Sequence, residues 1–344
     1  MAEETAGGLG EILDLVGAMK NTALPAGQTH GGDRRDGRVY AYSDEMVLAL
    51  QVALITSRPL LLSGAPGCGK SSLASFVARN LGLAYHEYVV TDESSPQDLL
   101  WRMDVIRRLN DAQLGGLRKD ELGRTSLLDY VEPGPLWWSI NPASAARRNL
   151  PSDGDGHREV KLLSPPTPLP DHEPSRPGAV LLIDEIDKAD SNFCNGLLVP
   201  LGSKQFSAPE LDSVVQAGGD QPAHSPLVVI TTNNEKELPE AFVRRCVALA
   251  IPEPTAQHLS ATAKLHYPAL ADDPAARGKV DEIAGRFVAE SVGIGASTAE
   301  FLDLVGTLLA LDVDLSSERW RQIERLVVEK PAARHAMPAR RRAR

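Results

Sequence analysis

The sequence predicts a parallel α/β fold followed by a smaller all-helical region, and three observations support this. Residues 60–63 form a short apolar run that leads into the pattern Gly-x-x-x-x-Gly-Lys-Ser, after which an amphipathic helix pattern begins. Helix-like and strand-like segments alternate on both sides of this pattern, as is typical of a parallel sheet. A second continuous apolar run at residues 179–183 indicates another fully buried strand.

The composition is that of an ordinary globular protein, with 344 residues, 42% hydrophobic and 24% charged. This length accommodates about two domains. The sequence contains no apolar run of the ~18 residues that a membrane-spanning helix requires. Residues 1–10 are acidic and glycine-rich, unlike a secretion signal. The three cysteines are scattered, so we expect no disulfide framework and a cytoplasmic protein.

The net charge of −10 disfavours extensive nucleic-acid binding. Residues 339–344, however, carry four arginines. This basic end could contact nucleic acid or an acidic partner, or it could be a solvated chain terminus. We expect residues 331–344 to form a flexible basic tail.

The N-terminal part, residues 1–38, contains one amphipathic helix pattern at residues 11–20 and then a flexible linker rich in Gly, Asp and Arg. A second helix is predicted at residues 43–56, because Ser43 suits the N-cap and two acidic residues follow it. A nucleotide-binding core is expected to extend from residue 39 to residue 253.

The glycine-rich pattern after the first strand is the sequence form of a phosphate-binding loop. Glycines allow several backbone N–H groups to converge on a phosphate, and the following helix adds the positive end of its dipole. Lys70 can reach the β- and γ-phosphates, and the Ser71 hydroxyl can ligate Mg²⁺. A plain glycine-rich turn is the alternative. The predicted nucleotide-binding residues are Gly64, Ala65, Pro66, Gly67, Cys68, Gly69, Lys70, Ser71 and Ser72.

The segments after this loop read as a helix at 71–81, a second strand at 85–90 and a single helix at 94–114. Residues 115–178 form an irregular insertion that includes a proline-rich loop at 151–178. It also contains Trp137 and Trp138, which we expect to pack beneath a loop rather than to form a binding surface.

The buried run at 179–183 ends in Asp184 and Glu185. In a protein with a phosphate loop, this Walker B pattern places an Asp near Mg²⁺ and a Glu where it can deprotonate an attacking water. An acidic turn is the alternative. The long separation from the phosphate loop indicates an insertion between them.

Two further strands are predicted at 226–232 and 247–251, and residues 203–222 look like a hairpin insertion. Asn233, at the end of the first of these strands, is a candidate for holding water or the γ-phosphate. Arg244 and Arg245 end a short helix at 239–245. They could be solvated, or they could reach the nucleotide of a neighbouring copy as an arginine finger. Residues 254–330 then show three apolar helical faces, which predict a helical lid.

Together, these motifs resemble those of AAA+ ATPases over residues 40–330. The wording of three segments is similar to the MoxR group: Gly-Pro-Leu-Trp at 134–137, Ile-Asp-Glu-Ile-Asp-Lys at 183–188, and Thr-Asn-Asn-Glu-Lys-Glu-Leu-Pro at 232–239 followed by Phe-Val-Arg-Arg-Cys at 242–246.

The resemblance implies a five-stranded parallel sheet of order 5-1-4-3-2 flanked by helices, a helical lid and a hexameric ring that binds ATP and Mg²⁺ between subunits. It assigns Mg²⁺ to Ser71 and Asp184, the catalytic base to Glu185 and sensor 1 to Asn233, with Asn234 as second choice. Arg245 is the expected arginine finger, with Arg244 as second choice.

One feature departs from the family pattern. The lid commonly carries a sensor 2 arginine early in the helix that here begins near residue 297, where this chain has Ser-Thr-Ala-Glu. Another arginine, such as Arg286, could serve instead, or the coupling between lid and nucleotide could be weaker.

The resemblance implies an ATPase that remodels or matures a protein client, with a von Willebrand factor A domain partner, in a setting such as a bacterial conflict system. Three alternatives stay open: a nucleic-acid motor, a slow nucleotide-gated assembly or signalling module, and a GTPase of the related restriction-enzyme branch.

Overall fold

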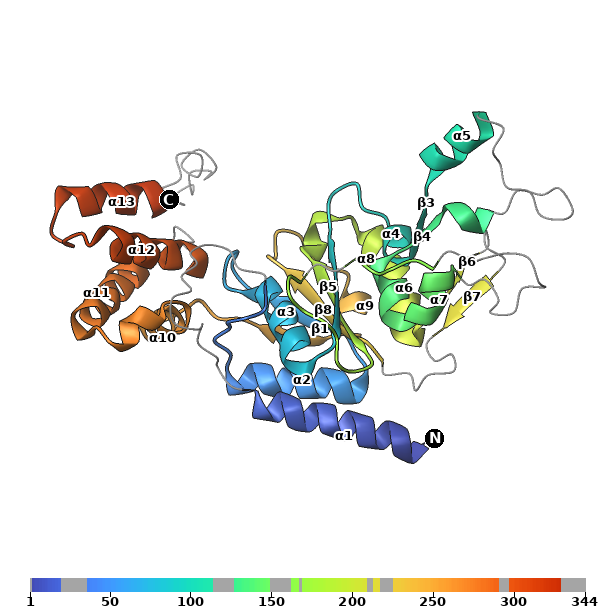
Figure 1. The fold of residues 1–344 in the computed structure, drawn as a ribbon, viewed down its shortest axis with the longest axis horizontal. Helices are drawn as coiled ribbons and strands as arrows, with labels where there is room; N and C mark the ends of the chain where they lie inside the picture. Colours follow the sequence, from blue (N-terminus) through green and yellow to red (C-terminus); the bar gives the residue numbers. More distant parts are fainter. Residues whose placement is uncertain are drawn as a thin grey trace, which may run out of the picture.

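The computed structural model describes residues 2–19, 36–113, 127–148, 162–166, 169–208, 213–216, 225–290 and 297–328. Most of the predicted N-terminal linker, residues 151–161 of the proline-rich loop and the basic tail lie outside these ranges. A five-stranded parallel sheet forms the centre of the molecule (Figure 1). Its strands are β1 (Leu60–Ser63), β2 (Ala84–Val89), β5 (Ala179–Asp184), β8 (Leu227–Thr232) and β9 (Val247–Ala250).

The strand order is β2-β5-β8-β1-β9, with all neighbours parallel. The labels differ from the predicted numbers because four short strands, which belong to two separate ribbons, are also numbered. Counted alone from the other edge, the five sheet strands have the order 5-1-4-3-2, as predicted. Because β1 lies between β8 and β9, the phosphate loop that follows it emerges at the carboxyl edge of the sheet beside the ends of these two strands.

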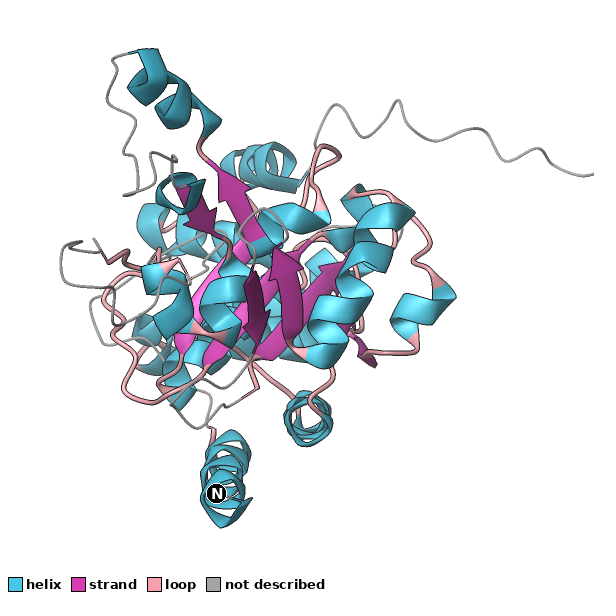
Figure 2. Cartoon of the chain, turned by 90° about the vertical axis from the view of Figure 1, so that its right-hand side faces the viewer, coloured by secondary structure: helices cyan, strands magenta, loops and turns pink. Residues whose placement is uncertain are grey.

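Helices cover both faces of the sheet (Figure 2). The strands alternate their side chains between the faces, as strand geometry requires. In β5, Val180 and Leu182 pack with α1 (Ala2–Ala18), α2 (Asp44–Thr56) and α3 (Lys70–Leu81). Leu181 and Ile183 pack on the other side, with α4 (Pro96–Leu100), α6 (Pro135–Ile140), α8 (Ser191–Ser203) and α9 (Glu240–Val243).

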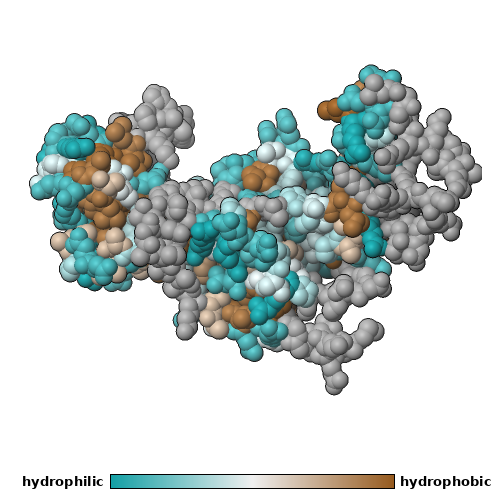
Figure 3. Space-filling model, in the orientation of Figure 1, coloured by the Kyte–Doolittle hydropathy of each residue, from teal (hydrophilic) through white to brown (hydrophobic). Residues whose placement is uncertain are grey.

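Helix α2 confirms the predicted cap, since the Ser43 hydroxyl accepts the N–H of Met46 at 3.3 Å. Helix α1 begins earlier than the predicted 11–20 and packs on α2 and α3. One side of α2 remains exposed, and Figure 3 shows a hydrophobic patch over this helix. Its large exposed apolar residues are Leu48, Val52 and Ile55.

The prediction of one helix at 94–114 is wrong. The chain forms α4, then β3 (Trp101–Met103), then α5 (Val105–Gln113). Strand β3 pairs antiparallel with β4 (Val131–Pro133), and Trp101 is buried in a separate aromatic cluster. Tertiary pairing therefore overrides the helical period of the sequence here. Helix α5 projects from the core (Figure 1).

Trp137 and Trp138 are buried, as expected, beneath neighbouring segments. The Trp137 ring meets the Phe206 ring edge-on at 5.6 Å. Phe206 belongs to an antiparallel ribbon of β6 (Gln205–Ala208) and β7 (Ser213–Gln216), which lies within the predicted hairpin insertion. The separate predicted insertion at 115–178 contains η1 (Leu127–Tyr130) and α7 (Pro142–Arg147). A short turn, η2 (Ile186–Lys188), follows β5.

The C-terminal region is helical and has a hydrophobic core of its own, which includes Phe301 and Trp320. It lies at one end of the molecule (Figure 1, left). Its elements are α10 (Ala256–His266), η4 (Pro268–Ala271), α11 (Pro274–Glu290), α12 (Thr298–Leu311) and α13 (Glu318–Val328). Among the described residues, no helix is long and apolar enough to cross a bilayer.

Candidate functional site

A cavity of about 460 Å³ lies at the carboxyl edge of the sheet, where the core meets the C-terminal helices. Parallel α/β sheets bind ligands at this edge. The phosphate loop, the ends of β5 and β8, residues 39–46 and parts of α10 and α12 supply the lining. Of the predicted nucleotide-binding residues, Pro66, Gly67, Cys68, Gly69, Lys70, Ser71 and Ser72 line it.

Glycine is required at two positions of the loop. Gly67 and Gly69 have φ angles of 72° and 91°, which residues with a Cβ atom rarely adopt. A Cβ on Gly67 would also lie 2.2 Å from the Cβ of Ser297, so the start of α12 closes directly on the loop.

Lys70 is the first residue of α3 and is only 5% exposed. Its Nζ donates hydrogen bonds to the carbonyls of Gly64 and Ala65, both at 2.8 Å. Gly64 and Ala65 therefore hold the Lys70 side chain through their carbonyls, although they do not line the cavity themselves. A buried ammonium inside a loop rich in N–H donors favours an anionic ligand.

The carboxylate of Asp184 collects two hydroxyl groups. Ser71 Oγ and Thr231 Oγ1 each donate to Asp184 Oδ1 at 2.6 Å. Thr231 Oγ1 also accepts the N–H of Glu185 at 2.8 Å. Thr231 is fully buried, and its side chain joins the two predicted Walker B residues. No role for Thr231 was predicted from the sequence, although a hydroxyl near the end of an otherwise apolar strand was a usable signal.

Glu185 follows the strand in a left-handed conformation, with φ of 59°. Its Oε2 forms an ion pair with Lys188 at 2.5 Å, and its Oε1 lies 3.5 Å from Asn233 Nδ2. The hydrogen bond to Glu185 raises the pKa of Lys188. The structure therefore brings the predicted base and the predicted sensor 1 together, and it adds a lysine that the sequence analysis did not single out.

Asp187 holds the turn that carries Asn233. Its Oδ2 accepts the N–H groups of Asn233 and Glu235 at 3.1 and 2.8 Å. Its Oδ1 is buried and has no hydrogen-bond partner among the described residues. The second aspartate of Ile-Asp-Glu-Ile-Asp-Lys was the available signal, because a buried Asp after a strand needs donors.

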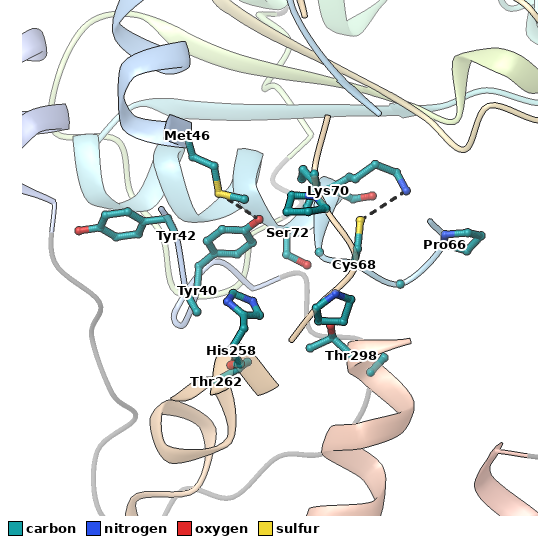
Figure 4. A pocket seen from close by; sticks show the side chains of 18 of the residues that line it. Tyr40, Tyr42, Met46, Pro66, Cys68, Lys70, Ser72, His258, Thr262 and Thr298 are labelled. Carbon is teal, nitrogen blue, oxygen red and sulfur yellow. Dashed lines mark hydrogen bonds between the residues drawn. The ribbon is translucent and has the colours of Figure 1, made fainter. Parts of the chain in front are cut away.

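The opposite wall of the cavity suits an aromatic ring. In Figure 4, Tyr40 lies between Met46 and His258, and its hydroxyl is 3.9 Å from Met46 Sδ. Burial raises the pKa of Tyr40 and lowers the pKa of His258, so both side chains are uncharged at neutral pH. Cys68 belongs to the phosphate loop, and its Sγ lies 3.8 Å from Lys70 Nζ. Burial raises the pKa of its thiol.

The predicted finger residues lie away from the cavity. Arg244 pairs with Glu240 at 2.5 Å, and Arg245 Nη1 donates to the carbonyl of Ala241 at 2.9 Å. Arg286 pairs with Glu282 of its own helix, so the structure does not bring this sensor 2 candidate to the cavity. Within the described residues, no arginine lines the cavity, and the start of α12 contributes only Thr298, Ala299 and Leu302.

The residues present fit a nucleotide with Mg²⁺. Ser71 and Asp184 offer the oxygen ligands that Mg²⁺ prefers, and the described residues contain no cluster of three or more His, Cys, Asp or Glu that could hold a metal alone. A cation here would need phosphate and water oxygens to complete its shell, which is usual for Mg²⁺ in phosphate-binding sites.

Residues 59–246 match the family model of the AAA domain, dynein-related subfamily. The chain belongs to this family. The matched range contains the phosphate loop, both Walker B acids, Asn233 and the two candidate finger arginines, so the family and the cavity agree on the same part of the chain. The helical C-terminal region lies beyond the match.

Solved structures with a similar fold include a mutant of Thermotoga maritima RuvB, with 16% identity, a TM-score of 0.45, and coverage of 85% of this chain and 73% of that one. The structure described as the Thermotoga maritima RuvB Holliday junction branch migration motor has 17% identity and a TM-score of 0.41, with coverage of 82% and 67%. A likeness at this level does not indicate the substrate of this chain. No curated protein matches the sequence.

Proposed function

We propose that this AAA-family chain binds ATP with Mg²⁺ and hydrolyses the γ-phosphate bond. One observation carries the proposal: Asp184 accepts the Ser71 hydroxyl at 2.6 Å in the same cavity that Lys70, Glu185 and Asn233 line. Phosphoryl transfer depends mainly on positioning and on charge stabilisation, and this cluster offers both.

The proposed roles follow from what each side chain can do. Lys70 and the loop N–H groups bind the phosphates, and Ser71 with Asp184 holds Mg²⁺, which neutralises charge on the phosphates when bound. Glu185 orients the attacking water and accepts its proton at a carboxylate oxygen. Asn233 orients the same water or the γ-phosphate through its amide. Glu185 must first leave Lys188, to which it is paired at 2.5 Å.

Two variants test this site. Lys70→Ala is expected to abolish nucleotide binding, measured by fluorescence titration, because the buried ammonium is lost. Glu185→Gln is expected to bind ATP normally and to lose turnover. Retention of micromolar affinity by Lys70→Ala would refute the phosphate-loop assignment. Turnover of ATP and GTP measured side by side distinguishes an ATPase from a GTPase.

We also propose that the active assembly is a ring, with six copies as the size that the family resemblance suggests. The cavity contains one lysine and no arginine among the described residues, which is little positive charge for a triphosphate. Arg245, or failing that Arg244, would come from the neighbouring copy. The exposed apolar side of α2 supports contact between copies, since a helix that is apolar all round is usually buried.

We divide the chain, by the same reasoning, into an N-terminal segment 1–38, a nucleotide-binding core 39–253, a helical lid 254–330 and a tail. The separate hydrophobic core of the C-terminal helices supports the lid boundary. Closure and opening of such a lid would convert hydrolysis into movement.

At the cellular level we propose a MoxR-like role in the cytoplasm, remodelling a protein client with a von Willebrand factor A domain partner. The support is the wording of the motifs at 134–137, 183–188 and 232–246. Capture of clients by Glu185→Gln held in ATP tests it, with Lys70→Ala as the matched control. Turnover that rises with duplex DNA and falls steeply with salt would favour a nucleic-acid motor instead.

A further inference from the structure

Arg58, to which the motifs assign no role, lies between α2 and β1 and binds the main chain that carries the candidate finger residues. Its Nε donates to the carbonyl of Arg245 at 3.1 Å, and its Nη2 donates to the carbonyl of Cys246 at 2.7 Å. Nη2 also donates to the carbonyl of Arg244. One guanidinium therefore holds three consecutive carbonyls.

These carbonyls belong to the turn from α9 into β9. Arg244 is the C-cap of α9, and Arg245 and Cys246 follow it, so their carbonyls have no partners within the helix. Arginine suits this place because its planar fork presents several donors in fixed directions. The N–H of Val247 donates to the carbonyl of Pro59 at 2.8 Å, so the two segments are joined at a second point.

The side chains of Arg244 and Arg245 are held much less firmly than their backbone. The Arg244 side chain is 75% exposed and pairs with Glu240 of its own helix. Among the described residues, the Arg245 side chain donates to the carbonyl of Ala241, within its own turn. Exposed i,i+4 pairs contribute only about 0.3–0.5 kcal/mol, so these side chains can turn outward while Arg58 keeps their Cα positions in place.

We propose that Arg58 is a positioning residue, which fixes the Arg244–Arg245 turn so that a finger arginine reaches the nucleotide of the next copy. This inference rests on the proposed function, in which those arginines act between copies. A misplacement of about 1 Å in a catalytic group can reduce a rate about 100-fold. Loss of the three carbonyl bonds therefore weakens hydrolysis in the neighbour and leaves the nucleotide site of the variant's own chain intact.

The first experiment measures steady-state ATP turnover of Arg58→Ala and Arg58→Lys in the full chain. We expect kcat to fall about 10- to 100-fold in Arg58→Ala, with KM for ATP unchanged, and to fall less in Arg58→Lys. Arg79→Ala is the matched control. Arg79 also donates to three carbonyls, those of Asp36, Pro170 and Asp171, but it does not touch the finger turn.

Arg79→Ala is expected to lower the thermal midpoint about as much as Arg58→Ala while keeping its turnover. Equal loss of turnover in both would show that Arg58 acts only through stability, which would overturn the proposal. If Arg58→Ala does not fold, Arg58→Lys decides the question, because it keeps the charge and loses the fork.

Mixing provides the sharper test. Arg58→Ala has an intact phosphate loop, and Lys70→Ala has an intact finger turn, so mixed rings contain sites in which a good loop meets a good finger. We expect the mixture to turn over ATP faster than either variant does alone. A parallel mixture of Arg245→Ala with Lys70→Ala tests the finger itself. Rescue in the second mixture alone overturns the role of Arg58, whereas rescue in neither overturns the proposed action between copies.

Discussion

Thr231 offers the most demanding test of the site, because a single hydroxyl connects both Walker B residues. The change is Thr231→Val, which keeps the shape of the side chain and removes the hydroxyl. The variant loses a 2.6 Å bond to Asp184 and leaves the N–H of Glu185 without its 2.8 Å acceptor.

The magnitude follows from these two bonds. A hydrogen bond to a charged group contributes about 1.5–3 kcal/mol, and a buried donor without a partner costs about 1–3 kcal/mol. We therefore expect the free energy of unfolding to fall by about 3 kcal/mol. Because Thr231 also holds the left-handed turn at Glu185, kcat should fall about 10- to 100-fold, as it does when groups that orient a catalytic site are removed.

The assay combines urea unfolding, ATP turnover and nucleotide binding without Mg²⁺. Binding without Mg²⁺ should be unchanged, since Thr231 does not touch the phosphate loop residues. Thr231→Ser is the control, because it keeps the hydroxyl and loses a methyl group, at about 1 kcal/mol. The reasoning is refuted if Thr231→Val matches Thr231→Ser in both turnover and stability.

Three further outcomes are expected. Burial lowers the pKa of His86 to about 4, so above pH 6.5 the imidazole is neutral in both the folded and the unfolded chain. As the pH falls from 6.5 towards 4, only the unfolded chain binds the proton, and the free energy of unfolding should fall by about 2 kcal/mol at pH 5. Urea unfolding at pH 7 and pH 5 checks this, and His86→Leu should show a smaller fall. Lys188→Ala should raise basal turnover by releasing Glu185, with little effect on unfolding, because solvent-accessible pairs contribute at most about 1 kcal/mol; unchanged or slower stopped-flow hydrolysis would contradict this. Asp187→Asn should lower stability by about 2 kcal/mol and lower kcat without changing ATP affinity, because the charge that holds the Asn233 turn is lost; unaltered kcat would show that this anchor does not matter.

The sheet and most of the site were predictable from the sequence because their signals are local. Continuous apolar runs identify strands buried on both faces, and the loop from Gly64 to Ser71 requires glycines and a lysine at fixed spacing. Asp184 and Asn233 follow such runs directly. The carboxyl ends of parallel strands share one edge, so residues more than a hundred positions apart were correctly placed together.

The features that were predicted wrongly or not at all depend on long-range contacts, which leave no local pattern in the sequence. Residues 94–114 have a helical period, yet pairing of β3 with β4 and burial of Trp101 divide the segment. Arg58 stands before a proline and an apolar run and gives no hint that it reaches carbonyls 186 to 188 residues away. The roles of Thr231 and Asp187 depend on which strand ends lie side by side, which is known only once the sheet order is known.

The position of β1 has a consequence for communication within the proposed ring. Arg58 precedes this four-residue strand and Gly64 follows it, so about 13 Å of hydrogen-bonded backbone separates the finger turn from the phosphate loop. Strand β9 runs alongside and ends at Ala250, and the carbonyl of the next residue, Ile251, lies 2.8 Å from where a Cβ on Gly64 would be. A displacement of the phosphate loop when nucleotide binds or leaves would therefore be transmitted along β1 to the turn that carries Arg244 and Arg245. In the proposed ring, the nucleotide state of one subunit would then affect hydrolysis in the subunit beside it, so that the sites would not act independently.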